Sequence, residues 1–286
     1  MKINMDTIYE MGEVDTGAEL FGKKFAAPFF AAPIAGIEMH YGDFYTDTTY
    51  AEPLVFGCKD AGIAAFTGDG APKSFYYPYI DAIKAAEGWG IATIKPWEYE
   101  DVMEKLRAAE EAGAMAICMD VDAAGLPHLM SLTKRPVGAK TTAQLGEIID
   151  STKLPFIIKG VMTVKGALKA LEAGAYGIVV SNHGGRVLDD CRATVEVLPE
   201  IVRAVGGRMK VFIDGGIRTG LDLFKVLAMG ADAALIGRPF PVAVYGGGRE
   251  GVALYANKVI TELSETMRMV GAKTLSDIVP EMVHIG

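Results

Sequence analysis

The segment IVVSNHGGRVLDD, residues 178–190, joins a strand-like apolar run to groups that can move protons and bind anions. Its β-branched residues are typical of a buried strand, which needs only turn chemistry at its end. This run ends instead in His183, two glycines and Arg186. An imidazole accepts a proton near neutral pH, and a guanidinium pairs with carboxylate or phosphate oxygens. The segment therefore predicts a catalytic base beside an anion-binding group.

Short apolar runs of the same kind recur along the chain with helical stretches between them. They lie at 27–33, 62–68, 90–96, 114–121, 154–160, 176–182, 209–216 and 232–239. Their lack of polar alternation is typical of parallel strands covered on both faces. The helical periods include 99–113, 164–174 and 220–230, each followed or closed by glycine.

Eight strand–helix units in series predict an α/β fold, a TIM (β/α)8 barrel, with residues 1–286 as a single domain. A final helix is expected at about 250–270, with the glycine-rich segment 245–251 as a flexible lead into it.

Polar side chains at strand ends would face the active end of such a barrel. These side chains are Thr67, Thr93, Lys95, Asp120, Asp122, Lys159, Ser181, His183, Arg186, Asp214, Arg218 and Arg238. The last two strands end in IDGGIRTG and IGRP, where glycine lets the backbone approach a ligand and arginine binds phosphate. Lys159 could stabilise negative charge developing on a ring system.

Composition limits the kind of ligand that the protein can bind and indicates where in the cell it is found. A net charge of −8 argues against nucleic acid as a partner. No apolar run approaches the roughly 20 residues of a membrane span, and the acidic N-terminus lacks the apolar segment of a signal peptide. We therefore expect a cytoplasmic protein without a membrane partner. Three cysteines far apart predict neither a metal site nor a disulfide framework.

Several motifs together resemble the FMN-dependent 2-hydroxy-acid oxidases and dehydrogenases, such as glycolate and lactate oxidase. They are PFIIKG, SNHGGR followed by LD, DGGIR and GRP, in that order. The resemblance is strong from about residue 154 to the C-terminus and traceable from APIAG at 32–36. It implies FMN as cofactor, a small-molecule 2-hydroxy acid as substrate, and a homo-oligomer, commonly a tetramer.

The resemblance also implies roles for individual residues. His183 takes a proton from the substrate as a hydride equivalent passes to flavin N5, Arg186 holds the substrate carboxylate, and Lys159 faces flavin N1 and O2. The other cofactor-binding residues that it implies are Ala35, Thr67, Thr93, Ser181, Asp214, Gly216, Arg218, Gly237 and Arg238.

The chain departs from the family pattern in the first half of the barrel. Where the family's third strand ends in Gln-Leu-Tyr, this chain has Thr-Ile-Lys, ending at Lys95. Asp120 replaces the first threonine of Thr-Val-Asp-Thr-Pro, and no arginine follows until Arg135. Lys95 and Asp120 either form an ion pair beside the flavin, or Lys95 replaces the lost carboxylate contacts. Both remain candidate substrate residues, as does His40 in the loop after the first strand.

Two other functions stay open. A non-redox FMN enzyme similar to type 2 isopentenyl diphosphate isomerase shares the barrel but needs a diphosphate-binding cluster. A flavin-binding protein without turnover is favoured by the missing arginine and tyrosine, and opposed by the presence of His183 and Arg186. The motifs do not choose the electron acceptor, which could be oxygen, a quinone, another flavoprotein or a carrier.

Overall fold

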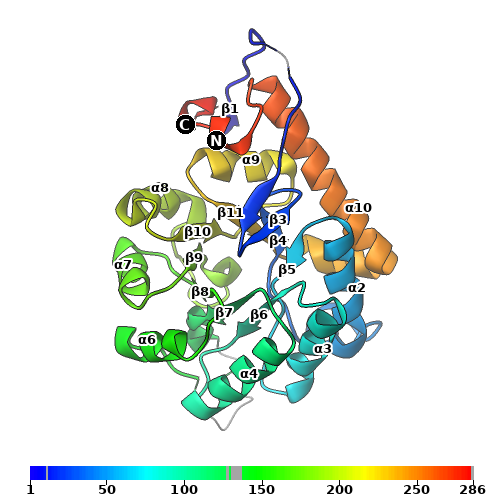
Figure 1. Cartoon of the computed structure of the whole chain (residues 1–286), viewed down its shortest axis with the longest axis vertical. Coiled ribbons are helices and arrows are strands. Elements are labelled where there is room, and N and C mark those ends of the chain that lie inside the picture. Colours follow the sequence, from blue (N-terminus) through cyan, green and yellow to red (C-terminus); the bar gives the residue numbers. More distant parts are fainter. Residues whose placement is uncertain (11, 127–128, 130–136, 285–286) are drawn as a thin grey trace.

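Eight short parallel strands form the centre of the computed structural model, which describes residues 1–10, 12–126, 129 and 137–284 (Figure 1). They are β4 (Phe29–Ala31), β5 (Ala64–Ala65), β6 (Ile91–Ile94), β7 (Ala116–Asp120), β8 (Phe156–Lys159), β9 (Gly177–Val180), β10 (Lys210–Ile213) and β11 (Ala233–Ile236). Their order is β5-β4-β11-β10-β9-β8-β7-β6, and a parallel bridge between Phe66 and Ile91 joins the two ends of this sheet. Each of the eight predicted runs contains one of these strands, so the predicted barrel is confirmed.

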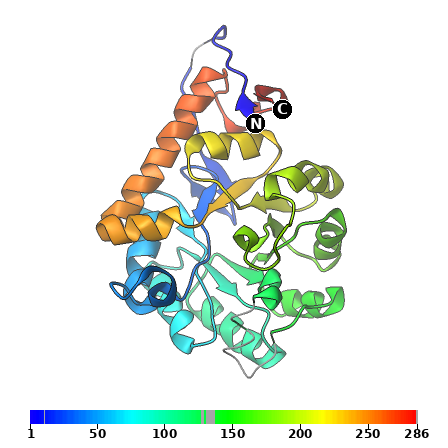
Figure 2. The ribbon, with the colours of Figure 1, turned by 180° about the vertical axis from the view of Figure 1, so that it is seen from behind.

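Helices follow the strands and surround the barrel (Figures 1 and 2). They are α1 (Ile37–Tyr41), α2 (Asp47–Asp60), α3 (Tyr77–Ala85), α4 (Tyr99–Glu111), α6 (Thr142–Asp150), α7 (Val164–Glu172), α8 (Thr194–Val205), α9 (Gly220–Ala228) and α10 (Pro239–Met269). The three helical periods noted in the sequence correspond to α4, α7 and α9. Within the described residues, no helix has the length and apolarity needed to cross a membrane.

The last helix begins earlier than expected. A helix at about 250–270 with a flexible lead was the prediction, but α10 starts at Pro239 and continues through the glycines to Met269. Proline suits the first turn of a helix, because backbone N–H groups have no intrahelical partner there and proline therefore loses no hydrogen bond. Gly247 and Gly248 have non-helical dihedral angles, so they kink α10 rather than precede it.

The amino end of the barrel is covered by an N-terminal hairpin made of β2 (Ala18–Leu20) and β3 (Lys23–Phe25). Phe25 is 3% exposed, and its ring centroid lies 5.0 Å from that of Phe30 and 5.6 Å from that of Trp89. Near the chain ends, β1 (Lys2–Ile3) pairs with β12 (Val283–His284), so the two termini lie together. With this end filled by aromatic rings, the polar strand ends are left at the opposite end.

Removal of the Phe25 ring should destabilise the barrel without changing its active end. We expect Phe25→Ala to lower the free energy of unfolding by about 3 kcal/mol, because it leaves a cavity among packed rings. Equilibrium unfolding in urea measures this. Phe44→Ala is the control, since Phe44 is 75% exposed. Equal effects of the two substitutions would contradict the role of the hairpin.

Candidate functional site

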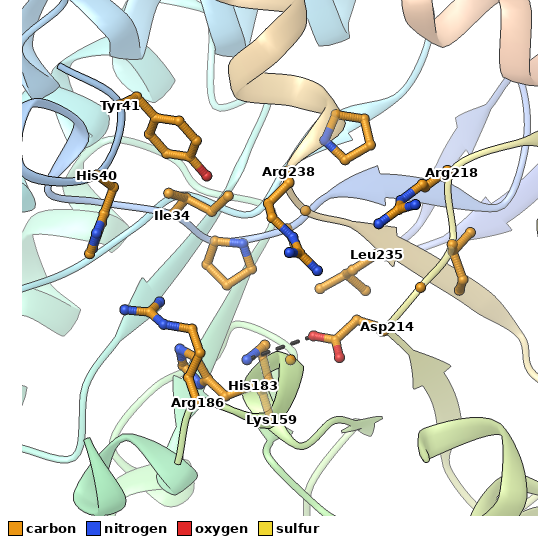
Figure 3. A pocket seen from close by; sticks show the side chains of 18 residues that line it. Ile34, His40, Tyr41, Lys159, His183, Arg186, Asp214, Arg218, Leu235 and Arg238 are labelled. Atoms are coloured by element: carbon orange, nitrogen blue, oxygen red, sulfur yellow. Dashed lines mark ion pairs between the residues drawn. The ribbon is translucent and has the colours of Figure 1, made fainter. Parts of the chain in front are cut away.

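Two neighbouring cavities of about 380 and 270 Å³ open at the carboxyl ends of the strands, and Figure 3 shows the first of them. They share the lining residues Pro33, Ile34, His40, His183 and Arg186. The first, called the anion cavity here, is also lined by Lys159, Asp214, Gly216, Arg218, Gly237 and Arg238. The second, called the inner cavity, is also lined by Ala35, Thr93, Lys95 and Asp120.

His183 projects from a tight turn directly after β9. Its φ of 57° lies in the left-handed region, which a residue with a side chain seldom adopts and which is often found at functional sites. The turn is supported on both sides. The amide of His183 donates to Ser181 Oγ at 3.1 Å, and Asn182 Oδ1 accepts from the amide of Gly185 at 3.2 Å. Gly184 and Gly185 continue the left-handed path without strain.

The imidazole of His183 is oriented by a carboxylate. Its Nδ1 lies 3.1 Å from Asp122 Oδ1 and 3.7 Å from Asp120 Oδ1. With Nδ1 engaged by Asp122, Nε2 is the ring nitrogen left for a ligand in the cavity. Asp122 would also stabilise the imidazolium that forms when Nε2 takes a proton.

A fully buried carboxylate, Asp120, lies between two ammonium groups. Its Oδ2 is 2.7 Å from Lys95 Nζ, and its Oδ1 is 2.8 Å from Lys159 Nζ. Burial alone would raise the pKa of Asp120, but the two ammoniums outweigh burial and hold that pKa well below its usual value. Burial would lower the pKa of Lys159, yet the surrounding carboxylates raise it above its usual value. Asp120 and Lys159 are therefore both charged at neutral pH.

Asp120, Asp122 and His183 have ligand atoms within 4.8 Å of one another, a spacing that a metal ion could bridge. The two ammoniums already compensate the charge of Asp120. The ion pairs thus account for this cluster without a metal.

Several buried polar atoms at the site have no partner among the described residues. They are Asp214 Oδ1, Thr93 Oγ1 and Asp122 Oδ2. Asp214 Oδ2 accepts from Ser181 Oγ at 2.9 Å and lies 3.8 Å from Lys159 Nζ. Burial raises the pKa of Asp214 more than Lys159 lowers it. Because buried polar groups are normally hydrogen-bonded, such orphaned atoms indicate contacts with a ligand.

The far end of the anion cavity suits a phosphate. Arg218 and Arg238 both line it, and both are exposed. At Gly216 and Gly237 an added Cβ would meet no atom within 4 Å, so a ligand can approach the backbone there. A phosphate at this end, a hydroxylated chain beside Asp214 and a polar ring edge near Lys159 and Thr93 together fit FMN.

A model of the FMN-dependent dehydrogenase family matches residues 1–131 and 130–285 of the sequence. The chain belongs to this family. The protein is therefore an oxidoreductase with FMN as its cofactor. The two matched segments of this FMN-dependent dehydrogenase meet in the stretch after β7, where the sequence departs from the resemblance described above.

Individual relatives of this dehydrogenase are named as oxidases of 2-hydroxy acids. It is 30% identical to a peroxisomal (S)-2-hydroxyacid oxidase of Arabidopsis thaliana, over 95% of this chain and 81% of the relative. It is 34% identical to an L-lactate oxidase of Lactobacillus jensenii, over 83% of this chain and 60% of that relative. A crystal structure of a mandelate oxidase variant superimposes with a TM-score of 0.81 at 28% identity, covering 98% of this chain and 86% of the other. These relatives favour oxidation over the isomerase alternative.

The barrel brings most of the predicted site residues to these two cavities. Thr67 and Ser181 are exceptions, since both are buried at their strand ends and line neither cavity. Thr67 Oγ1 donates to the carbonyl of Ile91, and Ser181 supports Asp214 and the turn of His183. Their contacts with the cofactor stay predictions.

Two residues at the site have no role that the sequence predicts. Asp122 is a strand-end acid, but nothing in the sequence pairs it with His183. Tyr41 lies on α1, lines the anion cavity, and has its hydroxyl on the side of Arg238 (Figure 3). Burial raises the pKa of Tyr41, and the charges of Arg238 and Arg186 oppose that rise. A search for polar residues at strand ends does not find Tyr41, because it lies on the short helix α1.

Asp214 should contribute to cofactor binding at a cost to the apoprotein. Its raised pKa means that apoprotein stability falls as pH rises from the unfolded pKa, about 4, through the higher folded pKa. We expect Asp214→Asn to weaken FMN binding about tenfold, since it loses a charge-assisted hydrogen bond. The melting temperature of the apoprotein at pH 7 should not decrease.

Quenching of flavin fluorescence during titration of the apoprotein measures the first effect, and thermal melting measures the second. Asp232→Asn is the control, because Asp232 lies at the amino end of β11. Unchanged FMN affinity in Asp214→Asn would contradict the assignment.

Proposed function

We propose that this FMN-dependent dehydrogenase oxidises a 2-hydroxy acid to the 2-oxo acid, with His183 as the base. The observation that carries the proposal is the Asp122–His183 contact of 3.1 Å at the junction of the two cavities, with Arg186 lining the same junction. A base and a guanidinium at one place match the hydroxyl and the carboxylate of a 2-hydroxy acid. The substrates named for the relatives support this class.

The cofactor is held by residues from several strand ends. Arg218, Arg238 and the backbone at Gly216 and Gly237 would bind its phosphate, and Asp214 would accept from a hydroxyl of the ribityl chain. Thr93 and Lys159 would meet the polar edge of the ring. When bound, FMN supplies the acceptor for the hydride equivalent that leaves the substrate.

The backbone around Ala35 would lie against the ring, and a buried carboxylate fixes the path of this backbone. Asp47 is 2% exposed and accepts from the amides of Gly36 at 2.9 Å and Ile37 at 3.0 Å. Its Oδ1 also accepts from the hydroxyl of Tyr79 at 2.8 Å. The loop that meets the ring is therefore set before the cofactor binds.

Proton transfer follows from the orientation of His183. Arg186 binds the substrate carboxylate, which places the 2-hydroxyl beside Nε2. Nε2 accepts the hydroxyl proton as the hydride equivalent leaves the substrate carbon, and Asp122 stabilises the resulting imidazolium. Loss of the proton and of the hydride equivalent leaves the 2-oxo acid.

The remaining expectations from the sequence are kept as predictions. His40 lines both cavities and stays a candidate substrate residue. Homo-oligomer formation and a cytoplasmic location are also proposals, and the Arabidopsis relative is named as peroxisomal. The electron acceptor is not assigned.

The substrate class can be tested without knowing that acceptor. We expect one stereoisomer from a panel of 2-hydroxy acids to bleach the oxidised-flavin absorbance of the holoenzyme under anaerobic conditions. The matching 2-oxo acids serve as controls that bind without reducing the flavin. Bound flavin that no hydroxy acid in the panel bleaches would contradict the proposed substrate class.

The role of His183 can be tested by the same bleaching reaction. We expect His183→Gln to slow substrate-driven flavin reduction by roughly 10²–10⁴-fold, the usual contribution of a general base, with FMN still bound. Stopped-flow absorbance measures the rate. His284→Gln is the control, because His284 is an exposed residue of β12 beside the chain ends. A near-normal rate in His183→Gln would remove the assigned base.

A further inference from the structure

We propose that Lys95, by neutralising Asp120, keeps the ammonium of Lys159 available to the negative charge that the flavin ring gains on reduction, and so raises the reduction potential of the cofactor. The three residues are called the charge triad here. The inference rests on the placement of FMN under Proposed function, but it needs no substrate. Lys95 acts through Asp120, so it is a positioning residue.

The strand register itself assembles the triad. In the ladder between β7 and β8, Asp120 pairs with Lys159. In the ladder between β6 and β7, Ile94 pairs with Met119, so the next residue, Lys95, falls beside Asp120. The result is the pair of short contacts to Asp120, 2.7 Å from Lys95 and 2.8 Å from Lys159. The side chains of Lys95 and Asp120 are 11% and 2% exposed, so water screens this pair little.

The backbone of Lys95 is held as firmly as its side chain. Its amide donates to Asp69 Oδ2 at 2.8 Å, and the same oxygen accepts from Trp97 Nε1 at 2.7 Å. Asp69 is itself buried and paired with Lys105. The end of β6 is thus fixed in place, and the ammonium of Lys95 has little freedom to turn toward a substrate.

The two cavities would place the flavin ring against this triad. With the phosphate at Arg218 and Arg238, which line the anion cavity, a ribityl chain beside Asp214 would lead the ring past Lys159 towards the inner cavity. Thr93 and Asp120 line that cavity, and Thr93 Oγ1 is one of the orphaned buried atoms. A polar ring edge beside Thr93 would therefore lie beside Asp120 and Lys159 as well.

Charge balance explains why the second lysine matters. The ammonium of Lys159 is surrounded by the carboxylates of Asp120, Asp122 and Asp214, all of which favour its protonated form. Without Lys95, Asp120 would have Lys159 as its one directly hydrogen-bonded cation among the described residues. The carboxylates around Lys159 would then repel the flavin ring, which gains one negative charge when it accepts a hydride. Lys95 removes that repulsion at Asp120.

The flavin potential of variants tests this inference. We would equilibrate each holoenzyme anaerobically with a reference dye during stepwise reduction at pH 7, with no substrate present. Lys95→Met should lower the equilibrium constant for two-electron reduction at least about tenfold, equivalent to a potential about 30 mV more negative. The double variant Lys95→Met/Asp120→Asn removes both charges, so its equilibrium constant should return to within about threefold of wild type.

A matched control is available at the other end of the barrel. Lys210 Nζ lies 2.7 Å from Asp232 Oδ1, the same separation as in the pair of Lys95 and Asp120. Lys210→Met should leave the potential unchanged. Because Lys210 and Asp232 are more exposed than Lys95 and Asp120, this variant controls for the loss of one lysine charge, whose general effect on the potential would appear in both variants.

The outcomes separate tuning of the cofactor from other roles. An unchanged potential in Lys95→Met, with KM raised for a substrate, would make Lys95 a substrate contact and overturn the inference. If Lys95→Met retains no flavin, the double variant Lys95→Met/Asp120→Asn decides between the two roles. A double variant that binds flavin with the wild-type potential supports the inference. A double variant that also loses flavin overturns it. A failed hydroxy-acid titration leaves the potentiometric result intact, so the two proposals fail separately.

Discussion

The carboxylate of Asp120, buried between two ammoniums, is the interaction on which the arrangement of the site depends. Removing three charges from water costs several kcal/mol for each ion, and short contacts must offset this cost. The parallel ladders supply those contacts, because they set Lys95, Asp120 and Lys159 side by side on neighbouring strands. A change in the register of β7 would separate the charges, so the ion pairs and the barrel register specify each other.

The amino end of the barrel provides stability, and the carboxyl end provides the groups for chemistry. The amino end is filled by aromatic rings from the hairpin and the strand starts, with Phe25 and Phe30 nearly fully buried. The carboxyl end keeps orphaned polar atoms and a left-handed histidine, which are unfavourable features without a ligand. Stability from the packed end allows these features to persist. The FMN contacts proposed for Asp214 and Thr93 would satisfy two of the orphaned atoms.

Some elements of the structure could be predicted from the sequence and others could not. The eight strands were predictable because each is a short apolar run covered on both faces, and parallel pairing places their polar ends together. The start of α10 was not, because Gly247 and Gly248 are typical of a loop. Their dihedral angles are indeed non-helical, but a helical stretch that starts at Pro239 precedes them and packs with the rest of α10 against α2 and α9. The contact between His183 and Asp122 could not be predicted either, since Asp122 lies in a short 3₁₀ helix after β7, 61 residues away in the sequence.

The sequence by itself determined which chemical groups stand at the strand ends: the base, the guanidiniums, the lysines and the glycines that admit a phosphate. It also determined the barrel and, through the family motifs, the cofactor. Only the tertiary structure decided the pairings. It joined Lys95 to Asp120, turned Nδ1 of His183 toward Asp122, and brought Tyr41 to the anion cavity. The reason is physical: closing the sheet brings strand ends from distant parts of the chain within a few ångströms, and register then fixes which side chains meet.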